Sequence, residues 1–440
     1  MEADTSMRLR IGIIALVIAA PAAAQNPAVR SDSAPTVTMD EAISRALAIQ
    51  PTMVQALGTE RNAAAASRAA WGGFLPSLSI GGSSNTNSSN RFNSQTGQIV
   101  NVPSSTSYSA SLSATFNIFE GFARTAALNA ARATADAAAA GYTSARYGTI
   151  LSVKEAYFAA LADEELVRVA QAQVTVSQTQ LQIAAQKLRA GAGTLSDSLS
   201  AAVTYGNSQV ALLTAQANLA GAEVSLGRQV GVNGPVRAVS DTTLPVFPDT
   251  GVIRAVPLGS TPLVAAADAQ AHAAGSFVTE SRAQYWPTFS VSYANGYTGL
   301  EAPWNSTSTY VNNWSYRFAL NWTLFNGFAR EQSITSASVS RDVAESQAAD
   351  TRRSVNASIA QQVISLGAAH TQVGISEANV ASGQEALRVA QEKFRVGAGL
   401  LLDVQTAEAN LAQAEVNLIQ ARFSYRTALA TLAALLGKDL

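Results

Sequence analysis

The side chains that could carry out chemistry are few in this chain, and their spacing suits neither catalysis nor metal binding. The sequence has no cysteine and two histidines, His272 and His370, which are far apart. It contains no Walker motif and no G-x-S-x-G sequence, and its two Gly-Ala-Gly segments lack the lysine and preceding strand of a phosphate-binding loop. We therefore predict that the protein is not an enzyme and has no disulfide, metal site or cofactor.

Two carboxylates stand at equivalent places after glycine turns. Residues 187–197 read KLRAGAGTLSD and residues 393–403 read KFRVGAGLLLD, so Asp197 and Asp403 occupy matching positions. Glycine and arginine at such turns fit ordinary helix C-capping. Thr194 and Asp197 fit a capping box, in which side chain and backbone bond reciprocally at a helix start. Leu400 replaces the threonine before Asp403, so we expect the complete box only in the first segment.

The turns belong to an internal repeat, which must position them. FNIFEGFAR at residues 116–124 reappears as WTLFNGFAR at residues 322–330, a shift of 206, and the glycine turns are shifted equally (397 − 191 = 206). A constant shift means that the segment between the two motifs has one length in both halves. We expect an internal tandem duplication, with a first repeat at residues 25–236, a linker at 237–260 and a second repeat at 261–440.

Long helices are predicted between the two motifs. Residues 125–189 contain no proline and carry apolar residues at three- and four-residue spacing, and residues 331–395 match them. We expect helices at 121–190 and 327–396, each roughly 100 Å long, with antiparallel coiled-coil partners at 195–230 and 401–436. Shorter helices are expected at 38–70, opened by a capping box at Thr38 and Glu41, and at 261–282.

Each half also contains two segments in which apolar and polar residues alternate. The pattern predicts strands at about 75–84, 106–119, 286–297 and 313–325, separated by polar loops at 85–105 and 298–312. Such alternation fits a membrane barrel strand and also a strand of a soluble sandwich. Because four strands cannot close a barrel and an open edge is not viable in lipid, a membrane barrel requires several copies of the chain.

The composition and the first residues indicate an exported protein without nucleic-acid partners. The formal net charge is −1, so the chain has no basic footprint for nucleic acid. Residues 1–24 read as a signal peptide with Met7 as the expected start, although a short membrane anchor is the alternative. Without a cysteine the chain has no site for a lipoprotein anchor.

Together these features resemble the TolC-type outer membrane efflux family over nearly the whole mature chain. The specific marks are the F-x-G-F-A-R turns at 119–124 and 325–330 and the glycine turns followed by Asp197 and Asp403. The resemblance implies a mainly α protein with a membrane β-barrel. In this arrangement a homotrimer shares a twelve-stranded barrel, four strands from each of three chains, in the lipid of the bacterial outer membrane. Long antiparallel helices continue it as a periplasmic α-barrel.

The resemblance also implies a function. The trimer would be a passive exit duct joined through a periplasmic adaptor to an inner-membrane pump, either proton-driven or ATP-driven. It would serve a tripartite efflux pump or a type I secretion system and conduct drugs, small molecules or proteins.

By the same resemblance, Gly191 and Gly397 contact the adaptor at the helical tips, with Leu195 and Leu401 as their apolar neighbours.

The resemblance further places Asp403, with Asp197, Phe394 and Arg395, at the periplasmic constriction. Three copies of Asp403 would form an acidic ring that favours cations. Some family members close this tip with a tyrosine and an arginine, and Phe394 and Gly399 stand at the matching positions here. The sequence therefore does not decide whether the resting tip is closed.

Two other functions compete with the duct. A trimeric coiled-coil surface adhesin also combines long helices with four strands per chain, although its strands form one C-terminal block. A periplasmic structural scaffold with small sheets would be recovered in the soluble periplasmic fraction.

Overall fold

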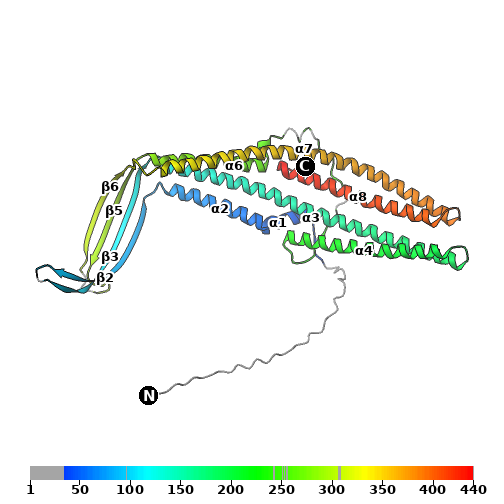
Figure 1. The fold of residues 1–440 in the computed structure, drawn as a ribbon, viewed down its shortest axis with the longest axis horizontal. Helices are drawn as coiled ribbons and strands as arrows, with labels where there is room; N and C mark the ends of the chain where they lie inside the picture. The colour runs from blue at the N-terminus through cyan, green and yellow to red at the C-terminus, as the bar shows by residue number, and fades with distance from the viewer. Residues whose placement is uncertain are drawn as a thin grey trace, which may run out of the picture.

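The computed structural model describes residues 34–95, 97–240, 243–249, 251, 253, 256–305 and 309–439. The expected signal peptide at 1–24 and the expected start at Met7 lie outside these residues. The described chain is elongated, with four strands at one end and helices that run to the opposite end (Figure 1). Among the described helices, none is both long and apolar enough to cross a membrane.

Four long helices form two antiparallel hairpins of equal size. Helix α3 (Ala123–Arg189) and helix α7 (Ala329–Arg395) each have 67 residues. Their partners, α4 (Leu195–Val230) and α8 (Leu401–Leu436), each have 36 residues. The start of α7 follows the start of α3 by 206 residues (329 − 123), which is the shift found in the sequence. The internal repeat is therefore a structural repeat.

Shorter helices pack beside the long ones between the sheet and the middle of the molecule. Helices α1 (Met39–Ile49) and α2 (Pro51–Gly72) lie along α3, and α6 (Pro262–Arg282) lies along both α3 and α7 (Figure 1). The single helix expected at 38–70 is thus two helices. Pro51 causes the break, because the residue before a proline avoids helical backbone angles, and Gln50 is extended with φ −60° and ψ 132°.

The four strands form one antiparallel sheet in the order β2-β3-β5-β6. They are β2 (Ser77–Asn93), β3 (Gln98–Glu120), β5 (Thr288–Gly299) and β6 (Val311–Asn321). A second, two-stranded parallel sheet joins β1 (Thr36–Val37) to β4 (Arg237–Ala238). The larger sheet leaves β2 and β6 as its two edges within one chain.

The first hairpin is longer than its sequence indicates. Most of residues 85–105, expected as a polar loop, pairs in β2 and β3, with a bulge between Asn87 and Ser89. Hydroxyl groups bond across the strands, for example Ser83 to Ser109 at 2.8 Å and Thr86 to Thr106 at 2.9 Å. The expectation was wrong because small polar residues that pair across strands have the composition of a loop.

Strand β6 ends earlier than the expected residue 325. Thr288, the first residue of β5, lies opposite Asn321, and beyond this point no strand in the described part of the chain continues the pairing. The Trp322 indole instead donates a hydrogen bond to the carbonyl of Tyr285 at 3.2 Å.

The repeated glycine–phenylalanine turns connect strand to helix through strained backbone. Phe122 and Phe328 have φ values of 66° and 65°, a region that residues other than glycine rarely occupy. The following arginines hold these turns. Arg124 donates to the carbonyl of Ile118 at 3.0 Å, and Arg330, which is 8% exposed, donates to that of Thr323 at 3.1 Å. Arg124 therefore ties the first turn of α3 to the end of β3, and Arg330 ties the first turn of α7 to the segment just after β6.

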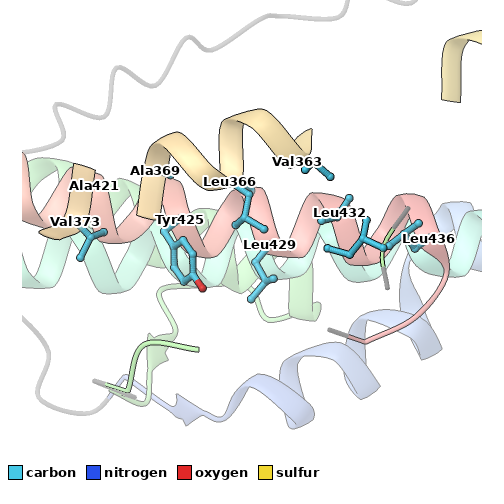
Figure 2. Close-up of a cluster of buried hydrophobic side chains, with 11 residues drawn as sticks. Val363, Leu366, Ala369, Val373, Ala421, Tyr425, Leu429, Leu432 and Leu436 are labelled. Atoms are coloured by element: carbon cyan, nitrogen blue, oxygen red, sulfur yellow. The ribbon is translucent and has the colours of Figure 1, made fainter. Parts of the chain in front are cut away.

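Hydrophobic clusters fix the helices to one another near the middle of the molecule. Figure 2 shows side chains of α7 and α8, including Leu366 and Leu432, gathered between the two helices. Two buried phenols attach the linker to this body: Tyr425 donates to the carbonyl of Pro245 at 3.0 Å, and Tyr157 donates to that of Val239 at 2.8 Å. The segment between the repeats thus packs on the helices.

Candidate functional site at the helical tips

The turns of the two hairpins lie at the same end of the molecule, opposite the sheet (Figure 1). Gly191 and Gly397, the first glycine of each turn, have φ values of 71° and 78°, which favour glycine. Both are exposed, and a Cβ atom added to either would meet nothing within 4 Å. The two residues therefore present bare backbone at the outermost point of each hairpin.

The two carboxylates that follow the turns act at the helix starts. Asp197 accepts a bond from the backbone N–H of Thr194 at 3.3 Å, and the Thr194 hydroxyl accepts the N–H of Asp197 at 3.1 Å. Asp403 likewise accepts the N–H of Leu400 at 3.1 Å, but a leucine side chain has no oxygen to complete the box. Asp197 is half-buried and Asp403 is exposed, so the second tip offers the more accessible carboxylate.

The two apolar residues singled out in the sequence differ in exposure. Leu195 is 63% exposed, whereas Leu401 is 6% exposed and packs in a cluster with Ala184 of α3 and Ala201 of α4. Leu401 therefore joins the two hairpins inside the chain, while Leu195 faces outward.

Phe394 also connects the hairpins. The Lys187 ammonium of α3 donates to the backbone carbonyl of Phe394 at 3.1 Å and lies 3.5 Å from the centre of its ring. Arg395, in contrast, pairs with Glu392 on the same helix at 2.9 Å, and both side chains are largely exposed. The Lys187–Phe394 contact is not evident from the sequence, because the repeat does not indicate which faces of α3 and α7 meet.

A second set of contacts between the hairpins was missed by sequence reasoning. Gln180 of α3 donates to Glu408 of α8, and Gln405 of α8 donates to the hydroxyl of Thr204 on α4 at 3.3 Å. Burial raises the pKa of Glu408 to about 7, with the Gln180 hydrogen bond acting in the opposite direction. The available signal was an acidic residue one turn after Val404 on the buried stripe of α8.

The described residues contain no group of three or more histidine or acidic side chains that could hold a metal ion. His370 packs instead between aromatic rings, with centroid distances of 4.9 Å to Phe247 and 5.7 Å to Tyr425. The tips thus offer exposed backbone, carboxylates and packing contacts, which suit protein contact and ion selection.

Comparison with known proteins gives a family for most of the chain. The family model described as outer membrane efflux protein matches residues 42–232 and 257–438. The two matched segments correspond to the two structural repeats. No curated protein sequence matches the chain.

Solved structures of outer membrane proteins have the same fold. VceC from Vibrio cholerae is 21% identical with a TM-score of 0.76, and the match covers 91% of this chain and 96% of VceC. CmeC from Campylobacter jejuni is 16% identical with a TM-score of 0.76, covering 91% and 85%. The open state of the MtrE channel of Neisseria gonorrhoeae is 17% identical with a TM-score of 0.74, covering 91% and 89%.

Proposed function

The chain belongs to the outer membrane efflux protein family, and on this premise we propose that it forms the exit duct of a tripartite efflux system. The duct is passive: an inner-membrane pump supplies the energy, and a periplasmic adaptor joins pump and duct. The observation that carries the proposal is the equal length of α3 and α7, 67 residues each. Both helices begin beside the sheet and end at the tips, so the two hairpins of every copy can reach one common rim.

The free edges of the sheet favour assembly from several copies. In lipid, unpaired N–H and C=O groups at a strand edge are costly, so a spanning sheet must close on itself. The side chains of β6 support a lipid-facing surface, since Phe318 and Leu320 are 67% and 73% exposed in the single chain. Two copies would give eight strands and an interior filled by side chains, whereas three would leave a lumen. We therefore propose a homotrimer.

The internal repeat predicts how neighbouring copies pair. Ser77 lies opposite Thr115 in the first hairpin, and Thr288 lies opposite Asn321 in the second, which are the same positions shifted by 211 (288 − 77) and 206 (321 − 115). Adding 206 to the residues of β3 gives those of β6, and subtracting 211 from the residues of β5 gives those of β2. The β3–β5 register therefore predicts a register between β6 and the β2 of the next copy. Leu112 opposite Asn295 then becomes Phe318 opposite Ser84 (112 + 206; 295 − 211).

At the other end, we propose that the adaptor binds Gly191, Gly397 and Leu195. All three are exposed, and the glycines allow another backbone to approach closely. Leu401 supports this surface from beneath, because it is buried between the hairpins.

The exposed carboxylate of Asp403 is proposed to line the periplasmic constriction, where three copies form an acidic ring that favours cations. Asp197, Phe394 and Arg395 belong to the same two hairpin tips, and the Lys187–Phe394 contact joins α3 to α7 within one chain, which supports a closed resting tip.

Deletion of the gene in a strain without a redundant channel tests the duct. Cells should accumulate dyes and become sensitive to detergents or antibiotics, and expression of the wild-type chain should restore both phenotypes. Loss of a secreted protein with normal dye efflux would instead assign the duct to a type I secretion system. Normal efflux and normal secretion would contradict the proposal.

A further inference from the structure

A buried acid–amide pair joins the two hairpins away from the tips. Glu408 of α8 and Gln180 of α3 are 2% and 6% exposed, and the Gln180 amide donates to Glu408 Oε1. The neighbouring contacts are also polar, since Ser177 bonds Ser208 at 2.7 Å between α3 and α4. Such a pair holds helices together only while its polar atoms are satisfied.

One atom of each partner lacks a hydrogen bond. Among the described residues, Glu408 Oε2 and Gln180 Oε1 find no hydrogen-bond donor, and both are buried. A proton on the Glu408 carboxyl would supply that donor. The neutral acid and the amide could then form a ring of two hydrogen bonds, with Gln180 Nε2 donating to Oε1 and Glu408 Oε2 donating to Gln180 Oε1. The ionised carboxylate leaves both buried acceptors without a donor.

In the part of the chain that the structure describes, no charged group compensates an ionised Glu408. There, only burial and the Gln180 bond shift its pKa. The ionisable residue closest along the chain to Gln180 on α3 is Lys187. The closest to Ser208 on α4 are Tyr205 and Asp197, and the closest to Glu408 on α8 are Asp403 and Glu415. On α7 the corresponding residues are Glu385 and Arg388. Lys187 binds Phe394, and Glu385 and Arg388 bind each other. Glu408 is already buried within a single chain, so its environment is set inside each copy.

We propose that Glu408 and Gln180 form a proton-dependent lock between α8 and α3, in which the neutral acid holds the hairpins together and ionisation loosens them. The role of this lock in opening the duct rests on the proposed function, whereas the proton-dependent packing does not.

The direction of the pH dependence follows from linkage. Packing raises the pKa of Glu408 from 4.5 to about 7, so packed helices bind a proton that separated helices release. The lock is therefore strongest below pH 4.5, weakens as the pH rises to about 7, and stays weak above it. Each pH unit by which the pKa is raised corresponds to about a tenfold change in the packing equilibrium.

Amide hydrogen exchange of the full-length assembled protein tests the lock. Exchange in residues 401–411 is measured from about pH 5 to 8.5 and corrected for the intrinsic pH dependence of exchange. Protection should fall by about tenfold or more over this range. Glu408→Gln should remain protected at every pH, because an amide can form the same ring with Gln180. Glu415→Gln, a matched control on the same helix, should keep the wild-type step, which is the fall in protection as the pH rises.

Flat protection in the wild type, or an unchanged step in Glu408→Gln, would overturn the lock. Single-channel recording over the same pH range then tests its consequence, with more frequent opening expected above pH 7. A step in exchange with pH-independent opening would retain the lock and reject its role in the duct. This separates failure of the inference from failure of the proposed function.

Discussion

Replacing Lys187 by methionine should loosen the two hairpins at the tip. The Lys187 ammonium lies 3.1 Å from the carbonyl oxygen of Phe394 and 3.5 Å from its ring centre, so one charge serves both contacts. A hydrogen bond from a charged donor contributes about 1.5–3 kcal/mol, and a half-exposed cation–π contact about 0.5–2 kcal/mol. Because both contacts share one ammonium and methionine keeps the apolar stem, we expect a net loss of about 1–2 kcal/mol.

A loss of this size changes the equilibrium between joined and separated tips by about 5- to 30-fold. Single-channel recording in planar bilayers should therefore show Lys187→Met opening more often than wild type. Arg189→Met removes the same charge two residues later on the exposed face and serves as the matched control. Wild-type opening in Lys187→Met would refute the contribution of the contact. Equally frequent opening in Lys187→Met and Arg189→Met would indicate a general charge effect instead.

Four further substitutions test the tips. Thr194→Ala removes the hydroxyl that accepts the backbone N–H of Asp197, so it should destabilise the first turn of α4 by about 1 kcal/mol. Leu400→Thr should stabilise the first turn of α8. Amide exchange measures both effects, and equal exchange in the wild type and both variants would contradict the capping account. Gly397→Ala should destabilise the turn by about 1–2 kcal/mol because of its positive φ, yet leave a folded trimer. Its affinity for the adaptor, measured by surface plasmon resonance, should fall by more than this strain explains. Asp403→Asn should weaken block of the channel current by divalent cations, whereas unchanged block would exclude the acidic ring.

The long helices could be predicted from the sequence because their signals are local. Between the strand turns and Gly191 or Gly397, the absence of proline and the three- and four-residue spacing define both helices, and the constant shift makes them equal. The interruption at Pro51 is also a local signal, since proline restricts the residue before it. Such features require no knowledge of what lies across the helix.

The contacts between the hairpins could not be predicted, because they depend on which helix faces meet. Lys187 and Gln180 lie on α3 among many polar residues, and only the packing brings them to Phe394 and Glu408. The strand ends were missed for a similar reason. Pairing partners, not composition, extend β2 and β3 through a polar segment and end β6 at Asn321.

Cysteine cross-linking tests the closed trimer most directly, because the natural chain contains no cysteine. A chain with Phe318→Cys and Ser84→Cys carries one thiol on each free edge of the sheet, at positions that the repeat places opposite one another between copies. A chain with Phe318→Cys and Ile80→Cys moves the second thiol by four residues on the same face, about 13 Å along the strand. With a short bifunctional thiol reagent on intact outer membranes, we predict a covalent trimer for the first chain and monomers for the second. Monomers in the first chain, or trimers in the second, would contradict the proposed closure of the duct.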